Sequence, residues 1–167
     1  MKEFEDIYEK NKDDVYRFIY KLTGYEAHIA EELLQETFYQ AFLSFERFRG
    51  DAQIKTWLCQ IAKNTYYQYI RSQVKGRNLT NKICQEETSH DFTEEIENKE
   101  LIRLIRIILE EFDERTRSIV LYRMCAELKF SEIAVLLGIK ESTAKVIYSR
   151  AKVKIQIQLK ERFEYEI

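Results

Sequence analysis

Apolar residues recur at helical spacing through the first half of the chain and divide it into three predicted helices. The helices are expected within residues 3–23, 30–45 and 54–69, where apolar positions repeat every three or four residues. Gly24 and Gly50 fall between these segments. A glycine suits a helix end or a turn, because it tolerates positive φ. The first half is therefore expected to be a small helical bundle.

The apolar period fades between residues 72 and 98, where the sequence QEETSHDFTEE is polar and acidic. A segment without periodic apolar residues has no face to bury, and this one is long for a connection inside one compact domain. We therefore expect an all-α protein of two small helical domains joined by a flexible linker. The expected bounds are 1–74 for the first domain, 75–97 for the linker and 98–167 for the second domain.

Helical spacing returns near residue 96 and continues through the second half. Asp113 is a candidate N-cap for one of these helices, because its carboxylate can accept hydrogen bonds from free backbone N–H groups. Residues 153–159 are ambiguous, since alternating apolar positions fit a strand while Ile155 and Leu159 also continue a helix. We expect a helix, because a lone strand would have no partner.

The strongest local motif lies within residues 130–152 and predicts a helix-turn-helix in the second domain. Ala134 would be the small residue at the helix crossing, and Gly138 would form the turn. Apolar residues that would pack the two helices together are Ile133, Leu137, Ile139, Ala144 and Ile147. The second helix would expose short polar groups and cations, as a DNA major groove requires: Glu141, Ser142, Lys145, Val146, Ser149, Arg150 and Lys152. A plain helical hairpin with solvated cations is the alternative.

Charge is unevenly distributed along the chain, although the formal net charge is only -2. Residues 51–80 carry 5 positive charges against 1 negative, and residues 139–162 carry 7 against 2. Acidic blocks surround both basic segments. A local field attracts a polyanion more directly than net charge does, so nucleic acid stays a candidate partner.

A second surface is expected on the helix within residues 30–45. Opposite the apolar face runs a row spaced i, i+3, i+4, i+7 and i+11, made of Glu32, Gln35, Glu36, Tyr39 and Leu43. Acidic groups beside an exposed aromatic residue are typical of a protein-docking surface. A simple solvated helix face would give the same pattern.

Several classes of protein are disfavoured by composition. The three cysteines, Cys59, Cys84 and Cys125, are widely spaced, which argues against a disulfide framework or a zinc site. The only histidines are His28 and His90, and no phosphate loop or nucleophile motif occurs. We therefore expect no enzyme, no catalytic residue, no metal, no cofactor and no small-molecule substrate. The charged N-terminus lacks a signal peptide's apolar core, so a cytoplasmic protein is expected.

Two stretches resemble the extracytoplasmic-function sigma factors of the sigma-70 family. Residues 30–64, AEELLQETFYQAFLSFERFRGDAQIKTWLCQIAKN, are similar to their conserved region two. Residues 130–152, FSEIAVLLGIKESTAKVIYSRAK, are similar to their region four. The resemblance implies a factor that binds core RNA polymerase and directs it to promoters. It also implies an anti-sigma factor as a further partner, which in this family is commonly linked to the membrane.

The resemblance assigns three sets of residues. Region two would grip core polymerase through Glu32, Gln35, Glu36 and Tyr39. It would also melt the minus-ten element and capture a base of the single strand through Phe48, Arg49, Lys55, Lys63 and Asn64. Region four would read the minus-thirty-five element of duplex promoter DNA through Ser142, Thr143, Lys145, Val146, Ser149, Arg150 and Lys152.

The residue types around the third helix suit this role. An unpaired base needs an aromatic surface, a polar group that reads its edge, and cations for the backbone. Phe48, Asn64 and Lys63 supply these types. Trp57 is left open between core packing and contact with nucleic acid, because it also lies on the apolar stripe.

One departure and three rival functions remain. Family members usually carry Ser-Arg where this chain has Val146 and Ile147, which puts the promoter sequence in doubt. The main rival is a free-standing helix-turn-helix transcription regulator that acts without polymerase. An enzyme and a helical adaptor without nucleic acid are the others, and the adaptor would leave both basic segments unexplained.

Overall fold

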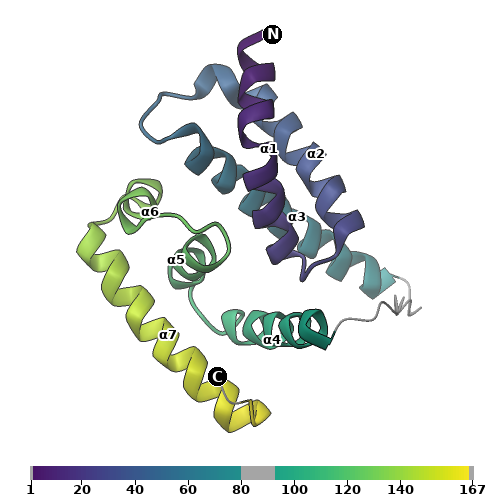
Figure 1. Ribbon diagram of the computed structural model, residues 1–167, viewed down its shortest axis with the longest axis vertical. Coiled ribbons are helices and arrows are strands. Elements are labelled where there is room, and N and C mark those ends of the chain that lie inside the picture. Colours follow the sequence, from purple (N-terminus) through teal and green to yellow (C-terminus); the bar gives the residue numbers. More distant parts are fainter. Residues whose placement is uncertain (1, 80–92, 166–167) are drawn as a thin grey trace.

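The structure is a computed structural model that describes residues 2–79 and 93–165. All the regular elements in these two ranges are helices, as the apolar periodicity predicts. Figure 1 shows them as an upper group, α1 to α3, and a lower group, α4 to α7. In chain order they are α1 Lys2–Leu22, α2 Ala27–Ser44, the 3-10 helix η1 Phe45–Arg47, α3 Ile54–Leu79, α4 Thr93–Leu109, α5 Glu114–Met124, α6 Phe130–Leu137 and α7 Glu141–Phe163.

The first group is a bundle of α1, α2 and α3, which all pack on one another. Its centre holds Val15 and Ile19 of α1, Ala41 of α2 and Leu58 of α3, all without exposed surface. Small residues on α2 allow the helices to approach closely, because ridges of large side chains then fit the grooves between them. The bundle fixes which side of α2 and α3 faces outward.

The second group is built around α7, which packs against α4, α5 and α6. Asp113 caps α5 as predicted, since its carboxylate accepts a hydrogen bond of 3.0 Å from the backbone N–H of Thr116. The ambiguous tail is helical, because α7 continues to Phe163 with Ile155 and Leu159 buried. The helical expectation for this segment is therefore confirmed.

The expected linker overlaps the ends of two helices. Helix α3 extends to Leu79, so residues 75–79 are helical, and α4 begins at Thr93. The central part of the expected linker, residues 80–92, lies outside the described residues.

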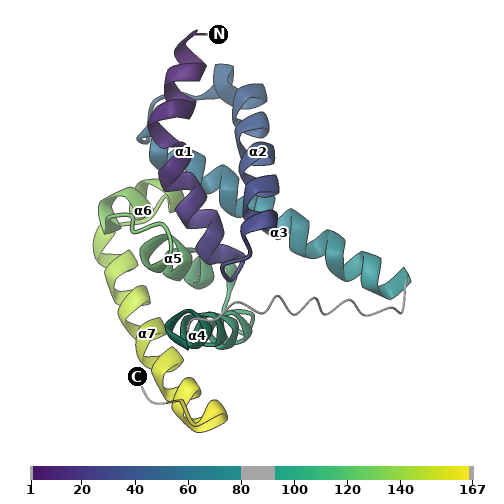
Figure 2. The same ribbon diagram turned by 45° about the vertical axis from the view of Figure 1, so that its right-hand side comes forward.

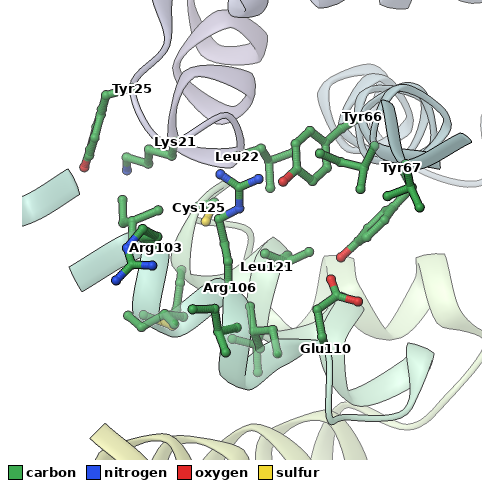
Figure 3. A pocket seen from close by; sticks show the side chains of 18 residues that line it. Lys21, Leu22, Tyr25, Tyr66, Tyr67, Arg103, Arg106, Glu110, Leu121 and Cys125 are labelled. Carbon is green, nitrogen blue, oxygen red and sulfur yellow. The ribbon is translucent and has the colours of Figure 1, made fainter. Parts of the chain in front are cut away.

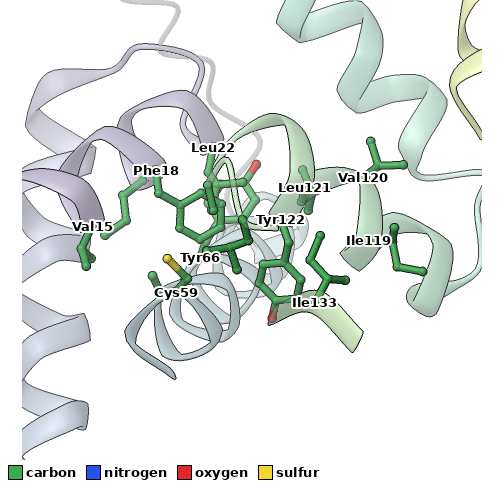
Figure 4. Packing of buried hydrophobic residues seen from close by; sticks show 14 of the residues in the cluster. Val15, Phe18, Leu22, Cys59, Tyr66, Ile119, Val120, Leu121, Tyr122 and Ile133 are labelled. Atoms are coloured by element: carbon green, nitrogen blue, oxygen red, sulfur yellow. The ribbon is translucent and has the colours of Figure 1, made fainter. Parts of the chain in front are cut away.

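The two groups of helices meet in a shared apolar core. Figure 4 shows α5 lying against α1 and α3, with Phe18 and Tyr122 at the junction. The ring centroids of these two residues are 6.4 Å apart. Polar contacts border the junction, since Lys21 pairs with Glu127 at 2.7 Å. The turned view in Figure 2 agrees that α5 and α6 lie beside the first group.

Candidate nucleic-acid and protein interfaces

The outward face of α2 carries the predicted acidic stripe. Helix α2 buries Ala30, Leu33, Phe38 and Ala41 toward the bundle. The four predicted docking residues point the other way and are all exposed: Glu32, Gln35, Glu36 and Tyr39. These side chains are therefore free to meet a partner, because the bundle does not use them for packing.

Two further apolar side chains enlarge this surface. Phe42 and Leu43 are 53% and 57% exposed, and Tyr39 is 56% exposed. Large side chains exposed side by side on one helix are typical of a protein-binding patch. Leu43 belongs to the stripe predicted from the sequence, whereas Phe42 was not predicted, although its i+3 spacing from Tyr39 was a usable signal.

An aromatic cluster supports the loop that carries Phe48 and Arg49. The Phe48 ring packs on Trp57, with centroids 4.9 Å apart, and Phe45 packs on the same indole at 6.4 Å. Phe48 and Trp57 are half-buried, while Arg49 is exposed. Trp57 is thus a packed residue that also forms the support beneath Phe48, so neither of its two expected environments describes it completely.

The two predicted lysines of this region are both engaged within the protein. Lys55 pairs with Asp14 at 2.7 Å, and this hydrogen bond lowers the pKa of Asp14. Lys63 is only 7% exposed, and its Nζ donates a 2.8 Å hydrogen bond to Ser118 Oγ of α5. Burial lowers the pKa of Lys63, because the charged form loses its water.

Asn64 differs from its neighbour because its side chain is exposed. It lines a small polar pocket together with Gln60 and Lys63 of α3 and with Asp113 and Glu114 at the start of α5. The residues predicted to contact the minus-ten element therefore differ in their exposure to solvent. Phe48, Arg49 and Asn64 reach the surface, whereas Lys63 is covered by the second helical group.

The helix-turn-helix forms as predicted in α6 and α7. Gly138 ends α6 at φ 62°, in the left-handed region that favours glycine. The backbone N–H of Ile139 then donates a 3.0 Å hydrogen bond to the Ala134 carbonyl. Ala134 and Ala144 are buried where the two helices cross. This packing turns one side of α7 outward.

All seven residues predicted to read duplex DNA are exposed on the N-terminal half of α7: Ser142, Thr143, Lys145, Val146, Ser149, Arg150 and Lys152. Lys145 pairs with Glu141 of the preceding turn at 2.7 Å. Tyr148 instead turns toward α6, where its ring lies 5.5 Å from that of Phe130. The structure therefore brings the whole predicted set together on one solvent-facing surface.

A groove that was not predicted from the sequence lies between the two helical groups. Its volume is about 920 Å³, and its walls come from α1, α3, α4 and α5. Figure 3 shows Tyr66 and Tyr67 of α3 facing Arg106 of α4 and Glu110, which directly follows α4. The Arg106 guanidinium lies 5.6 Å from the Tyr66 ring centroid, and burial raises the pKa of Tyr67 to about 12. Only the tertiary arrangement creates this groove, so no local pattern could predict it.

The described residues offer neither a group that could hold a metal ion nor a helix that could cross a membrane. Within residues 2–79 and 93–165 no group of His, Cys, Asp and Glu side chains is arranged to hold a metal ion. The same part of the chain contains no helix with the length and apolar character needed to cross a membrane.

Comparison with known proteins places both helical groups in one family. Residues 7–76 match the model of sigma-70 region 2, and residues 102–155 match that of sigma-70 region 4. Among relatives, "ECF RNA polymerase sigma factor SigM" of Bacillus subtilis is 25% identical, covering 91% of this chain and 92% of the relative. "RNA polymerase sigma factor YlaC" of the same organism is 26% identical, covering 97% and 95%.

Solved structures share the fold. The sigma factor RpoE of Bartonella quintana, solved in complex with the anti-sigma factor NepR, has a TM-score of 0.67 and 19% identity, covering 97% of this chain and 99% of that chain. CnrH, solved with the cytosolic domain of CnrY, has a TM-score of 0.64 and 16% identity, covering 95% and 88%. The chain belongs to the extracytoplasmic-function group of the sigma-70 family, and it acts with RNA polymerase in promoter-specific initiation of transcription.

Proposed function

We propose that this sigma factor docks on core RNA polymerase through α2, reads the minus-thirty-five element with α7 and captures a minus-ten base beside α3. The observation that carries the proposal is the exposed face of α7. Its hydroxyl groups and cations face solvent and do not pack against the other helices. Such a surface suits the major groove, which offers both hydrogen-bonding base edges and phosphates. A free-standing regulator is not favoured, because it would leave the sigma region of the first domain without a role.

Docking is assigned to the stripe on α2. Glu32, Gln35, Glu36 and Tyr39 are exposed, and the neighbouring Phe42 adds apolar surface. A partner that buries this patch gains apolar contact from the aromatic residues, and it gains specificity from the carboxylates. The partner face should therefore be apolar at its centre and basic at its rim.

Capture of the minus-ten base is assigned to Phe48, Arg49 and Asn64. Phe48 is held against Trp57 at 4.9 Å, which gives an aromatic ring a fixed orientation at the surface. A flipped base can stack on such a ring, while the Asn64 amide can both donate and accept hydrogen bonds at the base edge. Lys55 and Lys63 would contact the DNA backbone, which requires Lys55 to release Asp14 and Lys63 to release Ser118 of α5.

Regulation is assigned to an anti-sigma factor. The sigma factor RpoE, which shares this fold, was solved with the anti-sigma factor NepR, and CnrH, which also shares it, was solved with the cytosolic domain of CnrY. A membrane link of the inhibitor remains part of the proposal, as does action in the cytoplasm, where core polymerase and promoter DNA are found.

Run-off transcription with core polymerase tests the proposed function. The template should be a promoter that the reconstituted holoenzyme itself selects from a library. Arg150→Ala should relax preference at one upstream position and weaken binding by about 1–3 kcal/mol, the range for a bidentate contact with guanine. Glu161→Ala, an exposed change in the last turn of the same helix, is the matched control. Specific duplex binding by the free chain, with no gain from polymerase, would contradict the proposal.

A further inference from the structure

Val146 is an exposed aliphatic residue in the middle of the polar face of α7. Its side chain is 48% exposed, whereas the next residue, Ile147, is half-buried against the core. Ser142 lies one turn before Val146 and Arg150 one turn after it, and both are exposed. The three side chains therefore form one row, because residues four apart lie on the same side of a helix.

The chemistry of this row suits one feature of the major groove. Arg150 offers donors for a base edge and Ser142 offers a hydroxyl, but the isopropyl group of Val146 can form no hydrogen bond. Among the four bases, thymine alone presents a methyl group, at C5, in this groove. An aliphatic side chain held between two polar readers would bury that methyl and would leave the N4 amino group of cytosine without an acceptor.

The spacing along α7 also gives a register. Four residues of α-helix rise about 6 Å. Successive base pairs are separated by about 3.4 Å. For a helix that lies along the groove, Val146 is thus about two base pairs from the base that Arg150 contacts. We infer that Val146 is a specificity residue that selects thymine through its C5 methyl, about two base pairs from the Arg150 position. The inference rests on the proposed role of α7.

Uracil substitution tests this inference directly, because uracil differs from thymine only by the absence of the methyl group. Full-length chain with core polymerase first selects a promoter from duplexes randomised in the upstream element. Uracil then replaces each thymine of that element in turn, and holoenzyme affinity is measured. At one position uracil should weaken wild-type binding about fourfold, the effect of one buried methyl group. For Val146→Ala the same replacement should have little effect.

Val153→Ala is the matched control, because Val153 is 53% exposed on the same helix but lies two turns further on. This variant should keep the wild-type response to uracil. A selected element without thymine, a flat uracil response for the wild type, or an unchanged response in Val146→Ala would each overturn the inference. In those cases relaxed specificity of Arg150→Ala would still uphold α7 as the reader. If Arg150→Ala also leaves preference unchanged, the proposed function fails as well.

Discussion

Lys63 and Asn64 are neighbours in sequence, yet they face different surroundings. Lys63 turns toward α5, where its ammonium group contacts Ser118 and lies 5.5 Å from the Tyr122 ring centroid. Asn64 remains exposed. A helix rotates about 100° per residue, so adjacent side chains can serve an internal interface and an external ligand respectively. The family resemblance assigned both residues to DNA, but it could not distinguish these two sides of α3.

Asn64→Ala should reduce open-complex formation and blur preference at one downstream base. Replacing the amide removes a group that both donates to and accepts from a base edge. Because Asn64 is exposed, the melting temperature should change little. Permanganate footprinting of the promoter and thermal unfolding are the measurements. Gln73→Ala removes an exposed amide on the opposite side of α3 and should leave both unchanged. Loss of folding in Asn64→Ala would show that the amide is structural.

Lys63 should make the stability of the protein depend on alkaline pH. Its folded-state pKa is lowered by burial, so the unfolded chain binds more protons between that value and 10.5. The contribution of Lys63 to the free energy of unfolding therefore increases as pH rises from the folded-state pKa to 10.5. Denaturant unfolding of wild type and Lys63→Met should be compared across pH. The free energy of unfolding of the wild type should increase relative to that of the variant as pH rises. A constant difference would mean that Lys63 is not desolvated in solution.

At the scale of elements, local sequence patterns predicted α2, α6 and α7 well. Gly138 and the alanines at the crossing are local signals for the helix-turn-helix, and they appear in the structure as expected. The outward stripe of α2 likewise follows from periodicity alone. The ends of α3 and α4 were less predictable, because apolar spacing weakens before a helix stops. The roles of the exposed residues remain proposals, since exposure does not name a ligand.

Glu36→Lys should weaken binding to core polymerase while the fold stays intact. Glu36 is exposed, and its carboxylate accepts a 2.7 Å hydrogen bond from the Gln40 amide on the same helix. Charge reversal at a docking surface adds repulsion against a basic partner, whereas a surface substitution usually changes stability by only about 0.5 kcal/mol. Core affinity by fluorescence anisotropy and circular dichroism melting provide the comparison. Glu161→Lys, a reversal on α7, should retain core affinity.

At the scale of the whole molecule, the two helical groups share a core that sequence patterns could not reveal. Periodicity identifies the inner face of each helix, but it does not state which helix covers it. Tyr122 illustrates the limit, because it is 1% exposed and lies between α5 and the first group. The groove lined by Tyr66 and Arg106 has the same origin. Long-range packing decides both features.

Tyr122→Ala should destabilise both helical groups together. Removing a large buried aromatic side chain typically costs about 3–5 kcal/mol, through lost burial and the cavity left behind. Hydrogen exchange should quicken in α1 and α3 as well as in α5, since Phe18 loses its neighbour. Leu159→Ala is the contrasting variant, because Leu159 is buried in α7, within the second group. Its effect on hydrogen exchange should be strongest in that group. Faster exchange confined to the second group in both variants would show that the groups are independent.

The burial of Lys63 affects how tightly a ligand of its ammonium group can bind, because the protein must first open the contact between Lys63 and Ser118. A ligand that takes over this ammonium group can bind only molecules in which the hydrogen bond from Lys63 to Ser118 of α5 has opened. Its apparent dissociation constant is then the intrinsic value divided by the fraction of molecules in that open state. If the closed arrangement were favoured by about 2.8 kcal/mol, roughly one molecule in a hundred would be open, and the apparent affinity would fall about a hundredfold. A partner that holds the two groups apart restores this factor without touching the ligand.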